Sequence, residues 1–136
     1  MIDLMLAALL LQNVSPCDAV ERAGPPPADC PRWESWTQTA PADLFFDPAS
    51  VRREGTGFEI TTRTVYVAWR EDGVRSARTR YRYDCAQRTV ATTWLTTFDA
   101  SGTELTAGAP GGANPPARRV LARMAADRLL TRFCPG

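Results

Sequence analysis

The clearest pattern in the chain is an alternation of residue types in its middle third. In residues 74–84 (VRSARTRYRYD) most alternate positions from 77 on are small or aromatic, and the positions between them are charged. Successive side chains of a strand point to opposite faces of its sheet, so this segment predicts a β-strand with one polar face. Residues 58–70 and 87–99 are rich in Val, Thr and aromatic residues, which is typical of strands. Turns at residues 71–73 and 99–102 would join these strands as an antiparallel meander.

The same alternation assigns side chains to faces. One face of the central strand should carry Ala77, Thr79, Tyr81, Tyr83 and Cys85. The opposite face should carry Arg78, Arg80, Arg82 and Asp84. In residues 87–99 we expect one side to hold Val90, Trp94 and Phe98.

Shorter elements are predicted on either side of the meander. Residues 32–39 and 43–50 read as two early strands, the second ending in a turn where Asp47 accepts backbone hydrogen bonds, and residues 103–106 as a last strand. Residues 117–133 have helix-forming composition, with an apolar stripe of Ala122, Ala125, Ala126, Leu129 and Phe133 after an Asn-Pro start at 114–115. The predicted fold class is α+β: a single twisted antiparallel sheet of about five to six strands with one C-terminal helix packed on one face.

The N-terminal region divides the chain into three parts. Residues 4–11 (LMLAALLL) are too short to span a bilayer but fit a signal-peptide core, although Asp3 has the wrong charge for such a leader. We therefore expect a signal peptide in residues 1–16, a Pro-rich arm in residues 17–31 and the α+β domain in residues 32–136. A buried N-terminal helix is the alternative for the apolar run. Acylation of Cys17 is disfavoured because Pro16 occupies the position where a lipoprotein motif requires a small residue.

Four cysteines allow three disulfide pairings. The economical pairing joins Cys17 to Cys30 across the Pro-rich arm and Cys85 to Cys134 across the domain. Disulfides belong to oxidising compartments, so this pairing predicts a periplasmic, secreted or cell-surface protein with no transmembrane segment once mature. Four buried free thiols in a cytosolic protein are the alternative.

Composition removes much of the usual chemistry of catalysis. The chain has no His, and all 16 of its basic residues are Arg. Ser50 therefore has no histidine or lysine to activate it, and no histidine can ligate a metal. We expect no catalytic residues, no metal and no cofactor. A net charge of +1 also argues against a nucleic-acid partner.

The arginines of the central strand are the sharpest candidate for a binding site. Arg78, Arg80 and Arg82 would lie on one face of the sheet, with Arg63 able to join them from a neighbouring strand. Guanidinium groups bind carboxylate, sulfate and phosphate bidentately, so such a face could bind an acidic glycan or an acidic protein. A merely solvated strand is the alternative. For the four Trp residues we favour packing in the core or at sheet edges over a sugar-binding role.

The order of several short motifs resembles one known family. A Phe-Phe-Asp-Pro-Ala-Ser-Val segment at 45–51 is followed by Val-Tyr-Val-Ala-Trp at 65–69, by Asp84-Cys85 and by a terminal Cys134. This succession resembles the surface-adhesin protein E-like family of exported bacterial domains over roughly residues 32–134. The resemblance implies an antiparallel sheet with a C-terminal helix, an exported product and a Cys85–Cys134 bridge. For function the resemblance implies little: the named member of the family is a surface lipoprotein that binds host extracellular-matrix and serum proteins, whereas most of its relatives have no assigned role.

These observations together predict an exported, non-enzymatic binding domain of the bacterial envelope. Two other functions stay open. One is a small hydrolase that uses carboxylates such as Glu54, Glu59 and Asp99, although their spacing does not predict a pair. The other is a structural envelope factor.

Overall fold

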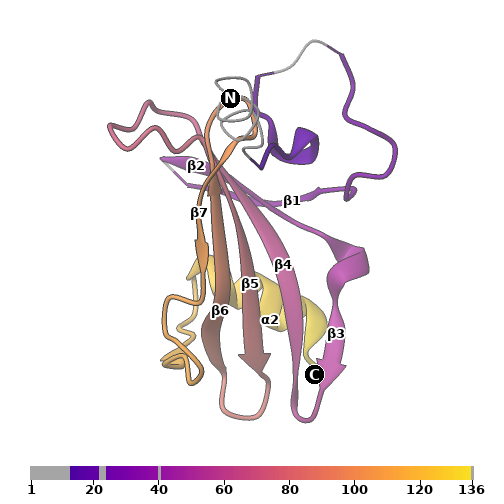
Figure 1. Cartoon of the computed structure of the whole chain (residues 1–136). Coiled ribbons are helices and arrows are strands. Elements are labelled where there is room, and N and C mark those ends of the chain that lie inside the picture. The colour runs from indigo at the N-terminus through magenta and orange to yellow at the C-terminus, as the bar shows by residue number, and fades with distance from the viewer. Residues whose placement is uncertain (1–12, 22–23, 40, 136) are drawn as a thin grey trace.

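The computed structural model describes residues 13–21, 24–39 and 41–135. Most of the predicted signal peptide, residues 1–16, lies outside this part of the chain. Figure 1 shows one twisted sheet with a single helix passing behind its central strands. The elements, in chain order, are η1 (Pro16–Asp18), β1 (Glu34–Thr39), β2 (Ala42–Phe46), η2 (Pro48–Ser50), β3 (Arg52–Glu54), β4 (Gly57–Tyr66), β5 (Ser76–Asp84), β6 (Thr89–Phe98), β7 (Glu104–Gly108), β8 (Arg118–Arg119) and α2 (Ala125–Phe133).

The sheet follows the predicted antiparallel order but has more strands than expected. Its main path is β1-β2-β4-β5-β6-β7, and β3 and β8 add to β4 and β6, which gives eight strands in the described chain instead of five to six. The two additional strands are only three and two residues long. Segments of this length are too short to show a period of two, so the sequence pattern could not reveal them.

The helix is shorter than predicted. It begins at Ala125 and not at residue 117, because residues 118–119 instead pair with β6 as strand β8. The backbone N–H of Val120, which is buried, donates to the carbonyl of Arg88 at 2.8 Å, and Arg123 has a left-handed φ of 73°. Burial of Val120 against the sheet has therefore overridden local helix propensity. As a result Ala122, predicted to lie in the buried helical stripe, is exposed.

The core lies between α2 and the helix-facing side of the sheet. Leu129 and Leu130 of the helix are both almost completely buried. On the sheet, the ring of Phe58 stacks on Tyr83 with centroids 4.8 Å apart, and Phe133 of α2 contacts Phe58 at 5.5 Å. The core cluster is completed by Phe46, Ile60, Val90 and Val120. Tyr83 and its neighbours at alternate positions of β5 thus face the helix as the alternation predicted.

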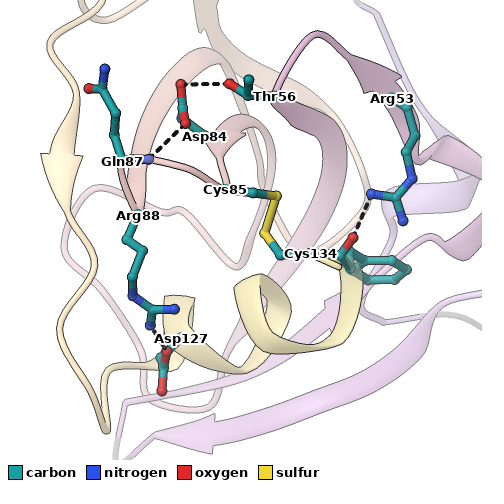
Figure 2. Close-up of a disulfide and its surroundings, with 9 residues drawn as sticks. Arg53, Thr56, Asp84, Cys85, Gln87, Arg88, Asp127 and Cys134 are labelled. Atoms are coloured by element: carbon teal, nitrogen blue, oxygen red, sulfur yellow. Dashed lines mark hydrogen bonds and ion pairs between the residues drawn. A yellow bond between two sulfur atoms is a disulfide. The ribbon is translucent and has the colours of Figure 1, made fainter. Parts of the chain in front are cut away.

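A disulfide fixes the end of this helix to the sheet (Figure 2). Cys85, directly after β5, bonds to Cys134, with 5.6 Å between the Cα atoms. Two further contacts hold the helix in place. Arg53 Nη1 donates to the carbonyl of Phe133 at 2.6 Å, and Arg88 Nη2 lies 2.7 Å from Asp127 Oδ1. The pairing that the sequence favoured is present.

The Pro-rich arm packs on the sheet and is closed by the second disulfide, between Cys17 and Cys30. The backbone of the arm and of the residues just before it bonds to the β6–β7 turn: Ser15 N donates to Gly102 O at 2.8 Å and Val20 N, within the arm, donates to Ala100 O at 3.0 Å. Gly102 has a φ of +85°, and a Cβ there would collide with the carbonyl of Ser15. The close approach of Ser15 to this turn therefore requires glycine at position 102.

We expect the two disulfides to contribute unequally to stability. Replacing Cys85 and Cys134 by alanine removes a cross-link that spans 49 residues, for which chain entropy gives a loss of about 4 kcal/mol. Replacing Cys17 and Cys30 removes one that spans 13 residues, for which the loss is about 3 kcal/mol. Urea unfolding followed by tryptophan fluorescence measures both. A larger loss of unfolding free energy on removing the Cys17–Cys30 disulfide would contradict this ranking of the two disulfides.

Candidate functional site

The predicted arginines lie on the sheet face opposite α2, which we call the front face. Strand register places Arg63 of β4 directly across from Arg78 of β5. Arg80 and Arg82 follow at alternate positions of β5, so all four share this face. The structure does not expose them equally, because the arm covers one end of the face and leaves the other open.

At the covered end, Arg78 forms an ion pair with Asp18 of the arm. Arg78 Nε and Nη2 approach the two carboxylate oxygens of Asp18 at 3.2 and 2.7 Å. Asp18 is only 1% exposed and also accepts a hydrogen bond from Ser15 Oγ at 2.5 Å. Ser76 Oγ donates to the backbone carbonyl of Asp18 at 3.2 Å. Arg78, predicted to bind an acidic ligand, therefore binds a carboxylate of its own chain in bidentate fashion.

Arg63 lines a pocket of about 360 Å³ between the arm and the sheet. The two cysteines of the arm disulfide form part of its wall. The side chains that line it from the sheet side are largely apolar and include Trp33, Phe45 and Val65. Arg63 is thus separated from the open part of the face.

At the open end, three exposed arginines surround one carboxylate. Arg80 Nε lies 3.6 Å from Glu59 Oε1. Glu59 is also directly across from Arg82 on one side and from Arg52 of β3 on the other. We call Arg52, Arg80 and Arg82 the arginine patch. The sequence analysis missed Arg52 because β3 has only three residues and no recognisable strand pattern.

A β-bulge brings Trp94 to this patch. The register between β5 and β6 shifts between Arg80 and Tyr81, so Arg80 faces Trp94 while Tyr81 faces Thr92. The bulged residue, Thr93, donates its hydroxyl to the carbonyl of Arg80 at 3.1 Å. Trp94, 41% exposed, consequently lies on the front face.

The bulge also corrects one predicted side assignment. Val90 pairs with Tyr83 and faces the helix, whereas Phe98 pairs with Ser76 and lies on the front face with Trp94. The expectation that Val90, Trp94 and Phe98 share one side is therefore wrong, because an extra residue in a strand reverses the alternation beyond it.

The carboxylates considered for catalysis have structural roles or lie apart. Asp47 caps η2 by accepting from Ala49 N at 3.0 Å, which confirms its predicted turn role. Asp99 accepts from Ser101 N and Thr103 N, both at 2.9 Å, in the β6–β7 turn. Glu54 lies at the opposite end of the sheet from Asp99, next to the β3–β4 turn, where it lines a pocket with Arg82 and Asp84. Among the described residues, no cluster of three or more Cys, Asp or Glu side chains could hold a metal ion.

The hairpin between β4 and β5 is a second exposed feature. It carries Trp69, which is 76% exposed, and the prediction of a packed side chain is wrong for this residue. Arg70 lies 4.4 Å from the ring centroid of Tyr66 and 2.7 Å from Asp72 Oδ2. The hydrogen bond from Arg70 lowers the pKa of Asp72 to about 2. Trp36, in contrast, packs on the helix side, where its Nε1 donates to Ala125 O at 3.0 Å.

These features define a small α+β domain with one antiparallel sheet, one helix and two disulfides. The family model for surface-adhesin protein E matches residues 33–135, so the chain belongs to the surface-adhesin protein E family. No described helix has the length and apolar character needed to cross a membrane.

Solved structures of protein E from Haemophilus influenzae have a similar fold. One, of crystal form II, is 13% identical with a TM-score of 0.55, and the match covers 84% of this chain and 96% of that one. Another is 12% identical with a TM-score of 0.53, covering 82% and 90%. Among curated proteins, none matches this chain.

We expect Asp18→Ala to destabilise the fold by about 2 kcal/mol. Removing one partner of a buried ion pair costs about 3–5 kcal/mol, and water reaching the partly exposed Arg78 reduces that loss. Glu21→Ala is the matched control, because the Arg75–Glu21 pair at 3.2 Å is exposed on its Glu21 side and should contribute less than about 1 kcal/mol. Chemical denaturation measures the free energy of unfolding of both variants. Equal losses would show that the Asp18–Arg78 ion pair does not stabilise the fold.

We expect Arg70→Gln to raise the pKa of Asp72 from about 2 toward its ordinary value of 3.8. A carboxyl with a lowered folded-state pKa favours the fold above its unfolded pKa and loses that contribution as the pH falls toward 2. An NMR titration of the Asp72 carboxyl carbon measures the change. Glu71→Gln serves as the control and should leave the pKa of Asp72 unchanged. An unchanged pKa of Asp72 in Arg70→Gln would show that the hydrogen bond from Arg70 does not lower it.

Proposed function

We propose that this chain is an exported, non-enzymatic binding domain of the bacterial envelope that binds acidic glycans at the open end of its front face. Membership of the surface-adhesin protein E family supports a role in binding. The observation that carries the choice of ligand is the arginine patch, in which three exposed guanidinium groups lie around the carboxylate of Glu59. Glu54 and Asp84 lie at the edge of the patch, where they line a pocket together with Arg82, and the Asp84 carboxylate accepts hydrogen bonds from Thr56 Oγ1 and Gln87 N.

The chemistry of the patch suits sulfate or carboxylate groups on a sugar chain. Alternate residues of a strand lie about 7 Å apart, so Arg80 and Arg82 can each contact a separate acidic group. Guanidinium binds both kinds of group bidentately. Trp94, directly across from Arg80, adds an aromatic surface for the apolar face of a sugar ring. A combination of cations with an exposed indole favours an acidic glycan over an acidic protein segment.

Export is part of this proposal. Two disulfides in a chain of 136 residues are typical of proteins that mature in an oxidising compartment. We infer that residues 1–16 direct export, that residues 17–31 form the arm and that residues 32–136 form the binding domain. The mature protein would act in the periplasm or at the cell surface.

The hydrolase alternative has little support. Asp99 orders the β6–β7 turn, and Glu59 forms an ion pair with Arg80. A glycosidase needs two carboxyl groups about 5–10 Å apart with one held protonated. The arrangement of these side chains therefore favours binding over hydrolysis.

We expect Arg80→Gln combined with Arg82→Gln to weaken binding to immobilised heparin about tenfold at low salt, since two charge-assisted contacts are lost. Trp94→Ala should weaken it several-fold. Surface plasmon resonance at low and high salt measures the affinities, and binding of the unmodified chain should fall steeply as salt rises.

The controls make the same chemical changes elsewhere. Arg123→Gln with Arg128→Gln removes two exposed arginines outside the front face, and Trp69→Ala removes an exposed indole from the hairpin. Both control variants should bind heparin with an affinity within about twofold of that of the unmodified chain. Polyglutamate tests an acidic protein as ligand. Salt-insensitive binding, or none to either polymer, would refute the proposal, and stronger binding to polyglutamate would refute the glycan assignment.

A further inference from the structure

A second pocket lies on the other side of the sheet, between its helix-facing side and the start of α2. Its volume is about 180 Å³. The sheet contributes aliphatic, aromatic and hydroxyl side chains, and the start of the helix contributes Met124, Ala125 and Ala126. The lining residues from the sheet and its edge include Leu44, Thr64, Tyr81, Tyr83, Val90 and Arg118. This pocket is separate from the front face and independent of the function proposed for it.

The hydroxyl of Tyr83 is an unsatisfied polar group at this pocket. Tyr83 is 1% exposed, and its hydroxyl has no hydrogen-bond partner among the described residues. A buried hydroxyl without a partner costs about 1–3 kcal/mol, so a partner in the pocket would be favoured. Burial raises the pKa of Tyr83 well above its ordinary value, which keeps the hydroxyl protonated and able to donate.

The remaining polar groups around the pocket also favour an anion. Arg118, across from Val90 on the same side of the sheet, is exposed and forms no salt bridge within the described chain. The nine-residue helix α2 starts without a side-chain cap, and the carboxylate in its first turn, Asp127, is paired with Arg88, so the backbone N–H groups at the helix start still favour negative charge nearby. The lining includes no Asp or Glu. Donors and positive potential thus converge on a site whose other walls are apolar.

We propose that this pocket binds a small carboxylate with an apolar body, with the Tyr83 hydroxyl donating to the carboxylate and Arg118 pairing with it at the rim. The volume limits the size of the ligand. A protein cavity of about 150 Å³ accommodates benzene, so a pocket of about 180 Å³ fits an aromatic or branched aliphatic acid of about the size of benzoate. Trp36, Val90 and Met124 provide the apolar contacts for its body.

Benzoate is the direct probe, with benzyl alcohol as its uncharged counterpart. In the full chain with both disulfides formed, we expect benzoate to shift the NMR signals of the Met124 methyl group and of the Ala125 and Ala126 amides. Benzyl alcohol should bind at least tenfold more weakly, because it lacks the charge that Arg118 and the helix start recognise.

Two substitutions test the assigned contacts. Tyr83→Phe removes only the hydroxyl and should weaken benzoate binding about tenfold while leaving the melting temperature unchanged or raised, since the free protein loses an unsatisfied polar group. Arg118→Gln should weaken it several-fold. Arg119→Gln, the neighbouring arginine of β8 with its side chain on the other face, is the matched control and should bind within twofold.

A filled pocket provides an independent test. Ala126→Leu places extra methyl groups into the pocket and should abolish the benzoate-induced shifts even if Tyr83→Phe proves too unstable to study. The proposal is overturned if millimolar benzoate leaves the Met124 signal unchanged, which would leave water as the pocket's occupant. It is equally overturned if benzoate binds Tyr83→Phe or Ala126→Leu as tightly as the unmodified chain.

Discussion

The architecture depends on the packing of one short helix against one sheet. A helix of nine residues is not stable alone in water, so α2 exists because Leu129 and Leu130 are buried against Phe58, Tyr83 and the other core residues. The Cys85–Cys134 bond and the hydrogen bond from Arg53 then fix its final turn. With one side of the sheet covered in this way, the other side is left for the arm and for solvent.

The front face is therefore divided into two unlike halves. Asp18 neutralises Arg78 at the covered end, where the arm also encloses the apolar pocket beside Arg63. At the open end three exposed arginines lie around Glu59, and Trp94 adds an aromatic surface. The strand pattern predicted a row of four arginines that could all bind a ligand. The structure has instead one internal ion pair and one exposed patch on this face.

Much of this architecture could be predicted from sequence because it follows from local periodicity. The alternation in residues 74–84 identified β5 and its two faces, and cysteine spacing indicated both disulfides. Features set by tertiary contacts could not be predicted. The burial of Val120 determines where the helix begins, the pairing of β3 adds Arg52 to the patch, and Asp18 reaches Arg78 from 60 residues away in the sequence. No pattern within a single segment contains that information.

The bulge at Thr93 has a consequence for how this fold can diversify. If β6 kept all its residues but ran without the bulge, its second half would continue the alternation of its first half, and the indole of Trp94 would turn toward the helix. The gain or loss of one bulge can thus exchange what the sheet presents to its surroundings, while Val90 and the strand before it keep their places. Relatives at 12–13% identity can share the scaffold and still offer quite different surfaces. Matching them residue by residue across this point would pair outward side chains with inward ones.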